Sequence, residues 1–142
     1  MADRSARAVW QGDLFEGSGT VSATSSGLFT DAAVTWASRT EDAGGKTSPE
    51  ELIAAAQAAC FCMALSNELS QRGHPPARLE VQAVCTFQPG KGVTAMTIDV
   101  TADVPDADDA AFREGLDAAE QSCPVSNALR GNVDIQVNGR LG

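Results

Sequence analysis

The sequence predicts an α+β protein with antiparallel sheets and a long, buried central helix. Residues of high helix propensity and β-branched residues occur in separate blocks, and one long apolar run stands between stretches that alternate apolar and polar positions. A chain of 142 residues is large enough for one hydrophobic core and too short for a second domain of ordinary size. We therefore expect a single domain over residues 1–142.

The N-terminal part of the chain predicts three antiparallel strands in a meander. Residues 6–38 alternate apolar and polar side chains in short bursts that are separated by Gly, Ser and Asp. The third burst, residues 33–36, places Arg39 at the end of the third predicted strand. Turn-forming residues 41–46 follow and lead into the apolar run.

A clear helix start precedes that run. Ser48 can cap the helix, Pro49 suits the first helical position, and Glu51 completes an S-x-x-E capping box. The pattern predicts a helix from Pro49 to about Arg72, and Gly73 ends it.

The predicted helix is apolar on every side. Residues 52–65 contain one strongly polar residue, Gln57. Such a helix must be buried all round, and a chain of this size has difficulty surrounding a helix about 36 Å long. The pattern therefore predicts a homodimer.

The C-terminal part predicts a hairpin, two helices and a strand. Alternation places Val81, Ala83, Cys85 and Phe87 on one face of the hairpin. A proline after Cys123 interrupts the helical pattern. In chain order, the predicted elements are strands 79–88 and 93–104, helix 106–121, short helix 124–130 and closing strand 132–138.

Composition excludes several functions. The net charge of −9 and the pI near 4.4 oppose a nucleic-acid surface, which needs clustered Lys and Arg. The first residues lack the apolar segment of a signal peptide, and the apolar run has the length of a buried core helix. We expect a soluble, cytoplasmic protein that binds neither nucleic acid nor membrane.

The four cysteines are irregularly spaced, which favours reduced thiols over a disulfide framework in a cytosolic chain. Cys60 and Cys62 would point about 200° apart on a helix and could not share a zinc ion. We expect no metal, and the chain has no motif for a bound cofactor. Cys62 and Cys85 are interpreted as core thiols. Cys123 stands at the start of a short helix, where the helix dipole lowers a thiol pKa.

Three segments resemble the signatures of the osmotically inducible protein C (OsmC) family, which includes the organic hydroperoxide resistance (Ohr) branch. They are Pro-Glu-Glu-Leu-Ile at residues 49–53, Ala-Ala-Cys-Phe at 58–61 and Cys-Pro-Val-Ser at 123–126. The resemblance implies an OsmC-like fold, an intertwined homodimer with active sites at its interface, and an antioxidant thiol peroxidase of the oxidative stress response. Its substrates would be organic hydroperoxides.

The same resemblance implies a role for each site residue. Cys60 would be the peroxidatic residue and Cys123 the resolving residue, and the two would form a disulfide. Arg39 matches the arginine of the OsmC branch, which would stabilise the thiolate and the departing alkoxide, and Glu50 matches the carboxylate that orients it. Glu50 and Cys60 would lie about 15 Å apart along one helix, so a residue from the second chain could complete the site.

The resemblance also implies an external dithiol reductant, such as a dihydrolipoyl protein. Two other functions remain open on the residues alone. Cys-Pro-Val-Ser at residues 123–126 resembles the site of a thiol-disulfide oxidoreductase, although it follows a late helix and not an early strand. The second open function is a noncatalytic redox-sensing module. Rapid turnover of an organic hydroperoxide with a dithiol would separate the peroxidase from both.

Overall fold

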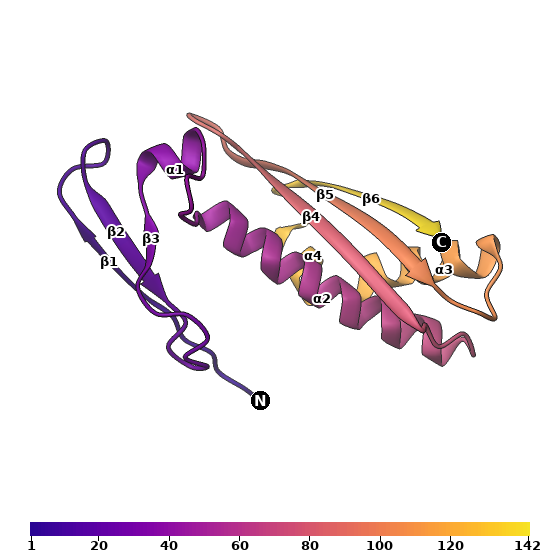
Figure 1. The fold of residues 1–142 in the computed structure, drawn as a ribbon. Helices are drawn as coiled ribbons and strands as arrows, with labels where there is room; N and C mark the ends of the chain where they lie inside the picture. Colours follow the sequence, from indigo (N-terminus) through magenta and orange to yellow (C-terminus); the bar gives the residue numbers. More distant parts are fainter. The chain divides into compact units, whose positions relative to one another are not determined.

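The computed structural model describes all 142 residues, which group into two compact units, residues 1–52 and 53–142 (Figure 1). The boundary falls inside the longest helix, α2 (Pro49–Gln71). Each unit contains one three-stranded sheet. The single domain expected over residues 1–142 stays a prediction.

The first unit contains an antiparallel sheet in the order β1-β2-β3, so the predicted meander is confirmed. Its strands are β1 (Arg7–Gln11), β2 (Ser18–Ser22) and β3 (Ala32–Val34). The third strand is shorter than predicted, because Thr35 and Ser38 form a capping box that starts the short helix α1 (Trp36–Thr40). Arg39 therefore lies in the last turn of a helix and not at the end of a strand.

Helix α2 begins and ends as the sequence predicts. The Ser48 hydroxyl accepts a hydrogen bond from the Glu51 amide at 3.1 Å, and Pro49 is the first helical residue. The Glu51 carboxylate accepts a hydrogen bond from the Thr47 hydroxyl at 2.6 Å. Gly73 has φ of +83°, a conformation that favours glycine after a helix.

The second unit contains a sheet in the order β4-β5-β6. The predicted hairpin is confirmed, since β4 and β5 pair antiparallel. The prediction of antiparallel sheets throughout is wrong, because β6 pairs with β5 in parallel; the two intervening helices carry the chain back across the sheet. The elements after α2 are β4 (Arg78–Gln88), β5 (Gly92–Asp103), α3 (Asp109–Ser122), α4 (Pro124–Leu129) and β6 (Asp134–Leu141).

The core of this unit lies between the sheet and helices α2 and α3, which cover one of its faces (Figure 1). The alternation predicted for β4 is confirmed at Val81, Ala83 and Cys85, which pack against the core. Gly115 of α3 lets the helices approach closely, since a Cβ atom there would lie 2.6 Å from Leu69 Cδ2. The fully buried hydrophobic side chains include Phe61, Leu65, Leu69, Met96 and Ile98.

One face of α2 is not covered within the chain. Ala55, Ala59 and Met63 are exposed, and Met63 reaches 68% exposure. The all-round burial predicted for this helix is therefore not reached within one chain. By length and composition α2 could also cross a membrane, but its opposite face, with Phe61 and Leu65 at 0% exposure, packs in the core.

Candidate active site

The four residues expected to form the site fall into two pairs. Arg39 and Glu50 belong to residues 1–52, and Cys60 and Cys123 belong to residues 53–142. One pair is charged, and the other consists of free thiols.

Arg39 and Glu50 form a bidentate ion pair. The Arg39 Nη2 donates to Glu50 Oε1 at 2.8 Å, and its Nε donates to Oε1 at 3.0 Å and to Oε2 at 3.2 Å. The Glu50 side chain is 8% exposed and that of Arg39 is 30% exposed. Two parallel hydrogen bonds fix the plane of the guanidinium.

The aromatic ring of Trp36 also contacts the guanidinium. The Cζ atom of Arg39 lies 5.8 Å from the centroid of the Trp36 ring, which is within the range of a cation–π contact. Trp36 in turn packs edge-to-face against Phe15, with centroids 5.9 Å apart. These contacts further restrict the position of the Arg39 side chain.

A cleft of about 510 Å³ lies beside this arginine. Arg39 is the one charged residue that lines it, and Thr35 is the one other polar residue. Such a cleft suits a small apolar molecule with one polar group. The apolar lining residues are Ala8, Trp10, Leu14, Val21, Val34, Trp36, Pro49 and Leu52.

The two thiols are brought together by the packing of α2 against the junction of α3 and α4. Cys60 lies on α2 and is half-buried; Cys123 joins α3 to α4 and is fully buried. Pro124 begins α4 and, as expected, separates it from α3. The Cys60 and Cys123 thiols lie close enough for each to shift the pKa of the other. The structure thus places both predicted thiols at one site.

The environment shifts the two pKa values in opposite directions. Burial raises the pKa of the Cys60 thiol. The Val125 backbone lowers this pKa, but burial together with the neighbouring Cys123 sulfur and its charge outweighs that effect. Burial also opposes ionisation of Cys123, but the backbone and hydroxyl of Ser126, the Cys60 thiol and the Val125 backbone outweigh it and lower the Cys123 pKa. Cys123 makes no side-chain capping hydrogen bond to α4, so we attribute the backbone effect to the orientation of the N–H dipoles. Within this pair the negative charge favours Cys123.

Two further polar side chains adjoin the thiols. Gln57 Nε2 donates to Ser126 Oγ at 3.0 Å and to Cys123 Sγ at 3.5 Å, and both Gln57 and Ser126 are 0% exposed. The sequence predictions did not include either residue. The available signals were the isolated polarity of Gln57 in an apolar run and the position of Ser126 in the Cys-Pro-Val-Ser segment.

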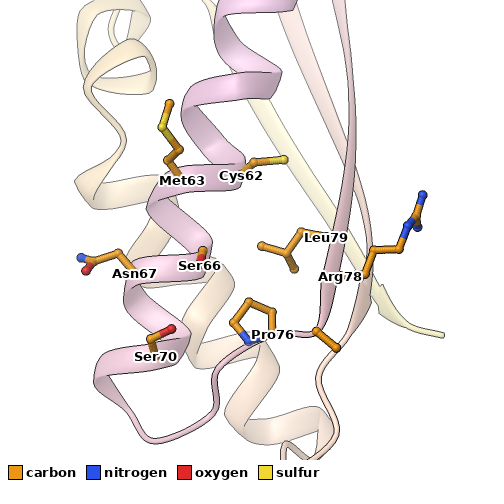
Figure 2. A pocket seen from close by; sticks show the side chains of 9 residues that line it. Cys62, Met63, Ser66, Asn67, Ser70, Pro76, Arg78 and Leu79 are labelled. Atoms are coloured by element: carbon orange, nitrogen blue, oxygen red, sulfur yellow. The ribbon is translucent and has the colours of Figure 1, made fainter.

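A second cleft, of about 600 Å³, lies between α2 and the segment that leads into β4 (Figure 2). Cys62 is half-buried and lines this cleft, so it does not belong to the core as predicted, whereas Cys85 packs against the core. Burial raises the pKa of the Cys62 thiol. Neither Cys60 nor Cys123 lines this cleft. No cluster of three or more His, Cys, Asp or Glu side chains has the arrangement of a metal site.

Comparison with known proteins defines the class. Residues 41–138 match the model of the OsmC-like protein family. Peroxiredoxin OsmC of Escherichia coli (strain K12) is 36% identical over 132 residues, which are 91% of each chain. An organic hydroperoxide resistance protein of Xanthomonas axonopodis pv. citri is 33% identical over 93 residues, covering 65% of this chain and 66% of that relative.

The fold agrees with solved structures of such proteins. The organic hydroperoxide resistance protein OhrB of Bacillus subtilis superposes with a TM-score of 0.68 at 28% identity, covering 96% of this chain and 98% of that chain. Both share a mixed α+β fold with small sheets and a long central helix. The chain belongs to the OsmC-like family, and the names of its relatives make this a family of peroxidase-type enzymes.

Proposed function

We propose that the protein is a thiol-dependent peroxidase that reduces organic hydroperoxides to alcohols, with Cys60 as the peroxidatic residue and Cys123 as the resolving residue. The observation that carries the proposal is the pair of neighbouring free thiols, which come from distant parts of the chain and shift each other's pKa. A thiolate and a second thiol within reach are what a disulfide-forming peroxidase needs.

In the first step the Cys60 thiolate attacks the terminal oxygen of R-O-O-H. An S–O bond forms, the O–O bond breaks, and the departing alkoxide takes up a proton to become the alcohol. Cys60 is oxidised to a sulfenic acid while the peroxide is reduced. In the second step Cys123 attacks the Cys60 sulfur, and the S–O bond breaks to release water and leave a disulfide. An external dithiol, such as a dihydrolipoyl protein, then reduces that disulfide and is itself oxidised.

A cation is required because burial raises the pKa of Cys60. We assign this role to Arg39, whose guanidinium stays charged and would stabilise both the thiolate and the developing alkoxide. Its bidentate pairing with Glu50 fixes the plane of the guanidinium, so Glu50 would act as a positioning residue. The apolar cleft beside Arg39 would accept the carbon skeleton of the substrate.

We further propose an intertwined homodimer whose sites combine residues from both chains. The exposed face of α2, with Ala55, Ala59 and Met63, supports a second copy as its cover, because small side chains permit close helix contact. Sedimentation at micromolar concentration tests the dimer, and a monomer would contradict it.

We also propose that the protein is cytoplasmic, because free thiols persist under reducing conditions such as those of the cytoplasm.

Shared sites can be tested by mixing two inactive variants. Cys60→Ser and Glu50→Ala chains, refolded together, should form mixed dimers in which one site has both wild-type groups, provided that those groups come from different chains. Activity should then reappear. A stable mixed dimer that stays inactive would reject the shared site and leave the dimer itself intact.

The proposed activity is tested by consumption of cumene hydroperoxide in the presence of a dithiol. We expect rapid turnover, with a higher kcat/KM than for hydrogen peroxide because the cleft can bury an alkyl or aryl group. Failure to consume either peroxide would reject the peroxidase. A protein that reduces disulfide substrates but not peroxides would be a thiol-disulfide oxidoreductase. Oxidation of its cysteines without turnover would favour a redox sensor.

A further inference from the structure

Gln57 is anomalous in its position. It is the one strongly polar residue in the apolar run of α2, and it is 0% exposed. Its amide nitrogen donates to Ser126 Oγ and to Cys123 Sγ, whereas its Oε1 atom is buried without a hydrogen-bond partner. An unpaired buried carbonyl oxygen lowers stability, and an apolar residue of similar size would avoid that loss.

A purely structural role accounts poorly for this arrangement. A buried glutamine that only joins two helices would normally have both ends of its amide paired. Here the paired end is the donor, and it is directed at the sulfur and at the hydroxyl next to it. Donors stabilise a thiolate far more than a neutral thiol. The geometry therefore matches the charged form of Cys123.

We propose that Gln57 is a positioning residue of the resolving step, whose amide N–H groups hold Ser126 and Cys123 so that the Cys123 sulfur faces Cys60 as a thiolate. The role in turnover depends on the proposed peroxidase function, whereas the effect on the thiolate does not. Ser126 connects Gln57 to Cys123, because its hydroxyl oxygen accepts a hydrogen bond from the Gln57 amide and the hydroxyl favours the Cys123 thiolate.

The groups that act on Cys123 come from two elements. From α2 they are the Gln57 amide and the Cys60 thiol, and from α4 they are the Ser126 hydroxyl with the backbone of Val125 and Ser126. Cys60 is the one ionisable side chain among them. No fixed charge of another residue masks the contribution of Gln57.

In the resolving step the Cys123 thiolate attacks the Cys60 sulfur, an S–S bond forms, and the S–O bond of the sulfenic acid breaks. The oxygen leaves as water after it takes up a proton. The negative charge on Cys123 disappears as the bond forms, so the hydrogen bonds from Gln57 weaken in this step. They raise the thiolate fraction but lower the nucleophilicity of each thiolate.

This trade-off predicts a distinctive pH profile for Gln57→Met. Loss of one hydrogen bond to a charged group should lower the thiolate fraction at neutral pH about tenfold. Each remaining thiolate should be about threefold more nucleophilic, given the usual dependence of nucleophilicity on thiol pKa. Resolution should therefore slow about threefold at neutral pH and become faster than wild type at alkaline pH, where both proteins are ionised. Simple loss of packing would slow it at every pH.

The first experiment measures Cys123 without any peroxide. In a Cys60→Ser, Cys62→Ser, Cys85→Ser background Cys123 is the sole thiol, and its titration is followed by the ultraviolet absorbance of the thiolate. Gln57→Met should move the titration to higher pH. Gln71→Met, the same change at an exposed glutamine on the same helix, should leave it in place. An unchanged titration in Gln57→Met would overturn the proposal.

The second experiment follows disulfide formation by stopped flow after one equivalent of cumene hydroperoxide, with Gln57→Met in the otherwise wild-type chain. A crossing of the two pH profiles supports the proposal, and parallel profiles reject it. If Gln57→Met does not fold, Gln57→Leu replaces it in the titration: a shift to higher pH supports the proposal and no shift overturns it. Absence of peroxide consumption by the wild-type protein rejects the peroxidase, while the titration still decides the role of Gln57.

Discussion

Arg39 and Glu50 are eleven residues apart in the sequence, whereas Cys60 and Cys123 come from opposite parts of residues 53–142. The ion pair depends on one short helix and the first turn of α2, and its arginine remains partly exposed. The thiol pair depends on the packing of α2, α3 and α4, and Cys123 is fully buried.

The two pairs therefore respond to different perturbations. The ion pair is short-range and consists of groups that are charged at neutral pH, so local substitutions should change it. The thiol pair becomes charged when one proton is lost, and its reactivity depends on how burial and hydrogen bonds divide that negative charge between two sulfurs. The predictions below act on one pair at a time.

The largest effect is expected at the thiol pair. Cys60→Ser should abolish consumption of cumene hydroperoxide, because a serine hydroxyl is not ionised at neutral pH and cannot form a sulfenic acid. Cys62→Ser and Cys85→Ser are the matched controls and should keep most of the activity. Full activity in Cys60→Ser would end the proposed mechanism.

The next effect is expected at the ion pair. Arg39→Ala should lower kcat/KM for cumene hydroperoxide about 10²- to 10³-fold, the usual result of removing one group that stabilises developing charge. Arg39→Lys keeps the charge but loses the bidentate geometry with Glu50, so its activity should lie between those of Arg39→Ala and the wild-type protein. Equal activity of Arg39→Ala and wild type would show that the cation is not needed.

A core substitution should test the packing on which the thiol pair depends. Leu65 is fully buried in the core that brings Cys60 and Cys123 together, so Leu65→Ala should lower the free energy of unfolding by about 2–5 kcal/mol. Ser70→Ala on the exposed side of the same helix should change it by less than about 0.5 kcal/mol. Urea unfolding measures both; similar values would contradict the assigned core.

The smallest effect concerns the shape of a pH profile. Because burial raises the pKa of Cys60, the rate of its reaction with peroxide should still rise with pH above neutrality in Arg39→Ala, about tenfold per pH unit while the thiol is mostly protonated. The wild-type profile should level off at lower pH if the cation favours the thiolate. Single-turnover rates measure this, and coincident profiles would argue against an electrostatic role for Arg39.

The sequence predicted most accurately the features that depend on local signals. The bounds of α2 follow from Ser48, Pro49 and Gly73, and the break before α4 follows from Pro124. Helix α1 was missed because its capping box, Thr35 with Ser38, stands inside a segment that alternates like a strand.

Features that depend on distant packing could not be predicted in the same way. The parallel direction of β6 is a consequence of the path through α3 and α4, which no local pattern encodes. The contact between Gln57 and Ser126 joins residues 69 positions apart, so spacing carries no signal for it. The pairing of Arg39 with Glu50 was expected from family resemblance, but the geometry of the ion pair could be learned only from the structure.

The parallel pairing of β6 also orders the events of folding. Strands β4 and β5 are joined by a short turn and can pair early, whereas Asp99 of β5 meets Asn138 of β6 across 39 residues. Until residues 134–141 have been synthesised, β5 keeps one open edge beside the apolar side chains of Met96 and Ile98. An open edge next to apolar side chains can pair with other chains, so a nascent or truncated product that stops before residue 134 should aggregate.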